Sequence, residues 1–71
     1  MKREVLSQLN KVLDDQGNPK ACGRENCKRA IWLANLLYPE VDYGDVETGM
    51  MKVENLNSLR KELENELELE G

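Results

Sequence analysis

The first helix is visible as a stripe of apolar positions near the start of the chain. Apolar residues stand at positions i, i+1, i+4, i+7 and i+8: Val5, Leu6, Leu9, Val12 and Leu13. This spacing brings them to one side of an amphipathic helix. Gly17 is typical of the residue after a helix end, and Pro19 is typical of the first turn of a following helix. The pattern predicts a helix over residues 2–16.

A second apolar stripe predicts a second helix that ends before Pro39. Its members are Cys27, Ala30, Ile31, Leu33, Ala34, Leu37 and Tyr38. The helix begins either at Pro19 or, because a glycine costs about 1 kcal/mol in a helix interior, after a short loop near Gly23. Trp32 and Leu36 lie to one side of the stripe, so we expect Trp32 to face solvent and to be available as an anchor for a partner.

Residues 39–53 show no helical period. The pair Thr48-Gly49 can turn a short hairpin between residues 43–46 and 50–53. A compact loop in which Met50 and Met51 fill gaps in the core is the alternative. Both arrangements place an irregular or hairpin segment between the second and third helices.

Leucines at intervals of three, four and four predict a third helix near the end of the chain: Leu56, Leu59, Leu63 and Leu67. Asn55 is a suitable N-cap for it. The closing stretch ELENELELE also alternates as a strand would, but we favour a helix because Leu and Glu form helices readily and strands poorly. The predicted fold is therefore mainly α: one small three-helix domain over residues 1–71, with an acidic end over residues 62–71 that can fray.

Composition argues against an enzyme. The chain has 71 residues, enough for one small core, and no histidine, which is the commonest general acid or base and the commonest zinc ligand. Cys22 and Cys27 are expected to be free thiols, because a chain without a signal segment points to a reducing, cytosolic setting. Zinc requires four ligands, and no obvious base lies beside the thiols, so neither a zinc site nor a catalytic cysteine is expected. We predict no catalytic residues, no metal and no cofactor. Without a signal segment or a run of about 18 apolar residues, we expect a cytoplasmic protein that does not enter a membrane.

Charge is distributed unevenly along the chain, whose net charge is −4. Residues 1–35 carry seven basic and four acidic side chains, and residues 36–71 carry three basic and ten acidic side chains. Asp14 and Asp15 oppose the dipole at the end of the predicted first helix, as the late glutamates do in the third helix. Charges placed against local helix stability suggest a role in binding.

The basic residues offer one candidate site. Lys20, Arg24, Lys28 and Arg29 would form a single positive ridge on a helix that begins at Pro19, with Trp32 continuing it. Such a ridge can contact phosphates and stack a base, and two helices joined by a turn resemble a helix-turn-helix arrangement. The acidic second half of the chain would repel a polyanion, so a nucleic-acid-binding module is our alternative and not our first hypothesis.

The acidic residues offer the other candidate site. We expect partner binding through Trp32 and a group of carboxylates: Asp42, Asp45, Glu47, Glu62, Glu64, Glu66, Glu68 and Glu70. Two arrangements are open. The third helix can pack beside the basic ridge and the Lys2/Arg3 end, where exposed ion pairs contribute about 0–1 kcal/mol each. Alternatively, the carboxylates face outward and imitate the phosphates that a basic partner surface recognises.

These features predict a small, acidic, non-enzymatic interaction protein: an inhibitor, adaptor or regulator that covers a basic surface of a partner such as a DNA-binding protein. In size and acidity the chain is similar to short bacteriophage-encoded proteins that disable host machinery, DNA mimics included, and this likeness is one of composition. Because the core is small and three short helices carry apolar stripes, a homodimer is a further expectation.

Overall fold

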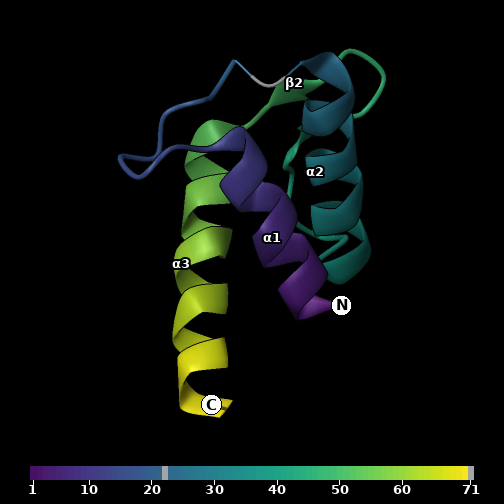
Figure 1. Cartoon of the computed structure of the whole chain (residues 1–71). Helices are drawn as coiled ribbons and strands as arrows, with labels where there is room; N and C mark the ends of the chain where they lie inside the picture. The colour runs from purple at the N-terminus through teal and green to yellow at the C-terminus, as the bar shows by residue number, and fades with distance from the viewer. Residues whose placement is uncertain (22, 71) are drawn as a thin grey trace.

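Three helices and a short β-hairpin make up the described part of the chain (Figure 1). In this computed structural model residues 1–21 and 23–70 are described, with Leu69 and Glu70 described by their backbone only. The elements are α1 (Lys2–Val12), α2 (Arg24–Leu37), β1 (Gly44–Asp45), β2 (Met50–Met51) and α3 (Val53–Glu70). The chain runs along α1 in one direction and along α2 and α3 in the other. The predicted mainly α fold, with a hairpin between the second and third helices, is confirmed.

The first helix is shorter than predicted. It ends at Val12, and Leu13 already has an extended backbone that forms an isolated antiparallel bridge with Pro19. The Oδ1 atom of Asp14 accepts hydrogen bonds of 2.9 Å from the backbone N–H groups of Gln16 and Asn18. Aspartate side chains that bond nearby amides in this way compete with helix formation. The predicted helix over 13–16 is therefore wrong, and Asp14 and Asp15 lie beyond the helix end whose dipole we expected them to oppose.

The second helix begins at Arg24, at the later of the two predicted starts. Gly23 precedes it with φ 90, a left-handed backbone conformation that glycine adopts without strain. Trp32 is 47% exposed and Leu36 is 50% exposed, which confirms that both lie outside the apolar stripe. Cys27 is half-buried against the core. The expectation for Cys22 lies outside the described residues.

The hairpin is shorter than the predicted one. Gly44 pairs with Met51, and Asp45 pairs with Met50, in an antiparallel register. At Gly44, φ is 128, and a Cβ atom would collide with the backbone oxygen of Met50, so a larger residue does not fit. Met51 packs against the core, whereas Met50 is 72% exposed. One methionine therefore fills the core as the alternative prediction proposed, and the other does not.

The third helix extends to Glu70, so the helical interpretation of ELENELELE is correct and the strand is not. It begins at Val53, two residues before Asn55, so the predicted N-cap is wrong. The side-chain Nδ2 of Asn55 instead donates a 2.8 Å hydrogen bond to the backbone oxygen of Asp42. This bond attaches the first turn of α3 to the segment that leads into β1.

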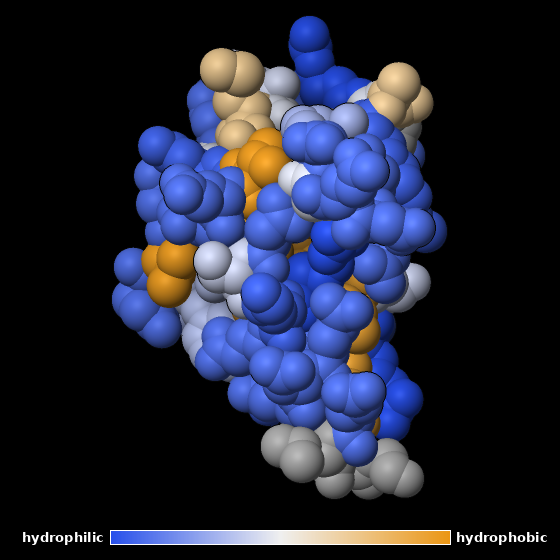
Figure 2. Space-filling view, turned by 90° about the vertical axis from the view of Figure 1, so that its left-hand side faces the viewer, coloured by the Kyte–Doolittle hydropathy of each residue, from blue (hydrophilic) through white to orange (hydrophobic). Residues whose placement is uncertain are grey.

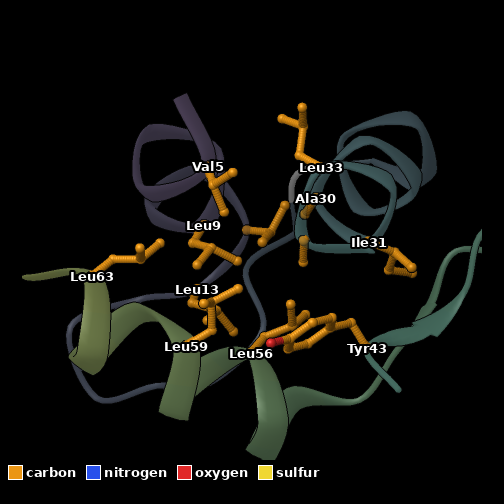
Figure 3. Packing of buried hydrophobic residues seen from close by; sticks show 12 residues of the cluster. Val5, Leu9, Leu13, Ala30, Ile31, Leu33, Tyr43, Leu56, Leu59 and Leu63 are labelled. Atoms are coloured by element: carbon orange, nitrogen blue, oxygen red, sulfur yellow. The ribbon is translucent and has the colours of Figure 1, made fainter. Parts of the chain in front are cut away.

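The core lies where all three helices meet (Figure 3). Its fully enclosed side chains are mainly aliphatic: Val5, Leu9, Val12, Leu13, Ala30, Ile31, Ala34, Leu56, Leu59 and Leu63. The ring of Tyr43 points toward Leu56 from the segment before β1. The one buried polar side chain among the described residues, Gln8, donates a 2.9 Å hydrogen bond to the backbone oxygen of Asn26 and so joins α1 to α2. None of the described helices is long and apolar enough to cross a membrane.

Candidate interaction site

Two side chains of α3 hold the loop that follows α1. The guanidinium of Arg60 donates to the backbone oxygens of Leu13 and Asp14, at 3.3 and 2.9 Å. Asn57 Nδ2 donates to the backbone oxygen of Gly17 at 2.6 Å. Spacing along the chain predicts no role for these two residues, because their partners lie 40 or more positions away in sequence. Arg60 bonds to carbonyl oxygens and, among the described residues, forms no ion pair with the glutamates that follow it in α3.

The glutamates of α3 do not form one face. An α-helix turns by about 100° per residue, so alternate glutamates fall on two sides of the leucine stripe. Glu62 and Glu66 lie on one side, which we call the first row, and Glu64 and Glu68 lie on the other, which we call the second row. The side chain of Glu70 is outside the described part. The predicted single acidic surface is therefore divided in two along this helix.

The first row lies beside other parts of the molecule. Glu66 forms a 2.8 Å ion pair with the Nζ atom of Lys2. Burial raises the pKa of the Tyr43 hydroxyl above its ordinary value, and the negative charge of Glu62 raises this pKa further. Glu62 itself is exposed. In this row, Glu66 thus contacts the N-terminal end of α1, and Glu62 lies near the buried Tyr43.

The second row borders an open cleft of about 490 Å³ between α1 and α3. The cleft is lined by Leu6 and Leu67, with a polar rim of Lys61, Glu64, Asn65 and Glu68. Glu64, Glu68 and Lys61 are exposed, and within the described residues none of the three belongs to an ion pair. The side of the molecule on which α3 lies is mostly hydrophilic, with hydrophobic residues visible only in separate spots (Figure 2). At this cleft, two exposed carboxylates therefore lie beside a small apolar surface formed by Leu6 and Leu67.

The acidic residues of the hairpin also serve its local structure. Asp42 Oδ1 accepts a 3.0 Å hydrogen bond from the Gly44 N–H, and Asp45 Oδ1 accepts one of 3.0 Å from the Glu47 N–H. Asp42 lies 3.7 Å from the amine of Lys52, and both side chains are well exposed. Glu47 is exposed and, like Asp45, is in no ion pair among the described residues. The hairpin thus presents negative charge to solvent while two of its aspartates hold its turns.

The predicted basic ridge is not continuous. Lys20 lies before α2, and its amine donates a 2.8 Å hydrogen bond to the backbone oxygen of Asn10 in α1. Lys28 lies 3.7 Å from Glu25 of its own helix, while Arg29 is exposed. Residues 13–23 separate α1 from α2, whereas a helix-turn-helix joins its helices by a turn of about 3–4 residues.

No ion pair among the described residues joins the basic side chains of α2 to an acidic side chain of α3 or the hairpin. Arg24 lies instead against the hairpin turn, where a Cβ atom at Gly49 would come within 3.0 Å of its Cγ. Of the two arrangements open from the sequence, packing of α3 beside the basic residues is represented by the Lys2–Glu66 pair. The remaining carboxylates of α3 that the structure describes face solvent.

Within the described residues, no group of three or more acidic or cysteine side chains is placed to hold a metal ion. Comparison with family models, with curated proteins and with solved structures finds no match to this chain. The function is therefore inferred from the surface and from the charges on it.

Proposed function

We propose that this chain is a small non-enzymatic interaction protein that regulates a larger partner by covering a basic surface on it. The observation that carries the proposal is the set of exposed carboxylates on the hairpin and α3 that form no ion pair among the described residues: Asp45, Glu47, Glu62, Glu64 and Glu68. Exposed charges of one sign attract a surface of the other sign and accelerate association with it.

The two rows on α3 suit a basic surface such as the DNA-binding face of a protein. Glutamates four residues apart on a helix have Cβ atoms about 6 Å apart, so Glu64 and Glu68 place two negative charges at that spacing, whereas Glu66 of the first row is paired with Lys2. The last carbonyl groups of α3 add partial negative charge at the same end of the helix. An array of this kind imitates a line of phosphates and does not need a specific sequence of partner residues.

The cleft between α1 and α3 supplies the apolar anchor that charge alone does not provide. Leu6 and Leu67 are half-buried, and Glu64 and Glu68 stand at their rim. An apolar side chain on a basic helix can enter the cleft while its lysines and arginines meet the glutamates. Trp32, which the sequence suggested as the anchor, lies on the exposed side of α2 and borders neither row nor the cleft. We therefore assign the anchoring role in this proposal to the cleft.

The proposal is tested by capture of partners from a nuclease-treated cell lysate, with washes at low and at high salt. We expect the tagged protein to retain a basic protein at low salt and to release it at high salt, because salt screens exposed charges. The double substitution Glu64→Gln/Glu68→Gln should abolish this capture. A matched control, Glu4→Gln/Glu25→Gln, removes two exposed charges from α1 and α2 and should leave it unchanged.

Three results would contradict the proposal. The lysate yields no basic protein; the two double variants lose the captured protein equally; or nucleic acid is retained once the nuclease is omitted while no protein is. The last result would support the alternative in which Arg24, Lys28 and Arg29 contact phosphates. Circular dichroism of both variants checks that the helices are intact.

A further inference from the structure

A second surface, separate from the carboxylates, lies on the exposed side of α2. Trp32 and Leu36 are about half exposed, and they stand four residues apart, so their side chains are neighbours on the helix surface. Arg29, one turn earlier, lies on the same side and is exposed. An exposed tryptophan next to an exposed leucine is the kind of pair that anchors protein interfaces when the surrounding charges complement each other.

The charges along this side of α2 change from one end to the other. Arg29 supplies positive charge directly before the apolar pair, while Glu25, one turn earlier on the same side, is exposed and lies 3.7 Å from the Lys28 amine. After the pair, the last turn of α2 has no basic residue, so the partial negative charge of its terminal carbonyl groups is not neutralised by a side chain of that turn. The exposed Glu40 follows shortly after the helix end. From Arg29 to the helix end the charge therefore changes from basic, through the apolar pair, to negative, and this stretch is complementary to its own reverse.

We infer that this surface binds the same surface of a second copy of the chain, with the two α2 helices antiparallel. A twofold axis midway between Trp32 and Leu36 places Trp32 of each copy against Leu36 of the other, as an isologous contact requires. Arg29 lies five residues from that midpoint, or about 7.5 Å along the helix. Five residues beyond the midpoint the helix has just ended, so Arg29 meets the negative end of the other α2.

Other arrangements of two copies fit less well. A parallel pair of α2 helices would bring the two Arg29 side chains together. Docking of α3 from a second copy would offer Trp32 little apolar surface, because Leu56, Leu59 and Leu63 are enclosed in their own core. The antiparallel α2 pair is the arrangement that satisfies both the apolar side chains and the charges. It uses none of the carboxylates on which the proposed function rests.

Sedimentation equilibrium from about 10 µM to about 1 mM tests this inference, because a contact of this size should be weaker than that of standard interfaces. We expect the mass to rise from 8.2 kDa toward twice that value. Trp32 is the one tryptophan of the chain, so its fluorescence reports directly on the contact. Its emission should move to shorter wavelength as concentration rises. A protein that stays monomeric throughout this range overturns the inference.

Substitutions locate the contact. Leu36→Glu puts a charge at its centre and should weaken dimerisation at least about tenfold. Met50→Glu makes the same kind of change at an exposed side chain of the hairpin and should have no effect. Arg29→Glu should weaken the dimer, and Arg29→Lys should retain most of it. Equal effects of Leu36→Glu and Met50→Glu would overturn the inference, since the loss would then reflect net charge alone.

The two proposals fail separately. The Glu64→Gln/Glu68→Gln variant should dimerise as the wild type does, even though it should lose the captured partner. A monomeric wild type whose Trp32 emission shifts on addition of an acidic helical peptide, or of a single-stranded oligonucleotide, would overturn the second copy as the occupant and identify the class that replaces it.

Discussion

The two halves of α3 differ both in composition and in surroundings. In the first half, over residues 53–63, Leu56, Leu59 and Leu63 are enclosed, and the Arg60 side chain holds the loop after α1. In the second half, over residues 64–70, Glu66 still pairs with Lys2 of α1, and the C-terminal end of α3 extends beyond the rest of the molecule (Figure 1). Its one apolar side chain that the structure describes, Leu67, is only half-buried.

Within this one helix, the first half stabilises the fold and the second half carries charged side chains exposed to solvent. Burial of leucines and hydrogen bonds to a distant loop fix the first half in place, and the second half inherits its helical backbone from the first. Glu64 and Glu68 in the second half therefore face solvent without a compensating interaction in the core. Buried leucines stabilise the fold in the first half, and exposed glutamates carry negative charge in the second.

The largest effect should come from the core of the first half. Leu59→Ala removes an enclosed side chain and should lower the free energy of unfolding by about 2–5 kcal/mol, which is a large share of what a small domain has. Leu67→Ala, in the second half, should cost less than half as much. Urea denaturation followed by circular dichroism measures both. Equal losses would mean that the two halves contribute alike to the fold.

Loss of the Arg60 contacts should have the next largest effect. Arg60→Ala leaves the backbone oxygens of Leu13 and Asp14 without these donors and should cost about 1–3 kcal/mol. Arg60→Lys should not restore the loss, because one ammonium group lacks the planar fork that reaches both oxygens. The neighbouring exposed Lys61→Ala should stay within about 0.5 kcal/mol of wild type. A full rescue by lysine would show that only the charge matters.

Charge removal in the second row should change stability least among these substitutions, and in the opposite direction. Glu64→Gln/Glu68→Gln should leave the free energy of unfolding unchanged or raise it by a few tenths of a kcal/mol, because these carboxylates oppose the helix dipole. Glu66→Gln, which loses the ion pair with Lys2, should be less stable than this variant by up to about 1 kcal/mol. Denaturation curves in which the double variant is clearly destabilised would assign the second row a folding role.

The free energy of unfolding should show a small dependence on pH through Tyr43, which lies near Glu62 at the end of the first half of α3. The pKa of Tyr43 is raised in the folded protein, by burial first and by Glu62 second. Above about pH 10 the unfolded chain therefore releases this proton before the folded one does, and stability falls as pH rises. Tyr43→Phe should show a shallower fall in this range than Tyr38→Phe, measured by urea denaturation. Identical slopes would remove Tyr43 as the cause.

Periodic patterns predicted the helices well, and contacts between distant residues were not accessible from the sequence. The leucine stripe of α3 and the exposed position of Trp32 follow from spacing along one helix. The early end of α1 follows from a side-chain bond of Asp14, which spacing does not reveal. The role of Arg60 depends on where the loop lies in space, and so does the cleft that Leu6 and Leu67 share.

The acidic surface was predicted as a set of residues and not as a shape. Counting charges showed that the second half of the chain is acidic, but the count treats all five late glutamates alike. The helical turn puts Glu64 and Glu68 beside the cleft and Glu66 beside Lys2. The surroundings of these glutamates differ because α1 packs against α3 and brings Leu6 to the cleft and Lys2 to Glu66.

Native-state hydrogen exchange along α3 tests the division of this helix most directly. Amides of residues 59–63 should exchange only when the whole domain unfolds, so their exchange free energy should equal the free energy of unfolding measured with urea. Amides of residues 65–68 should exchange through local opening, at clearly lower free energy. Equal protection along the whole helix would contradict the account, because the second half would then be held by the fold and not presented by it.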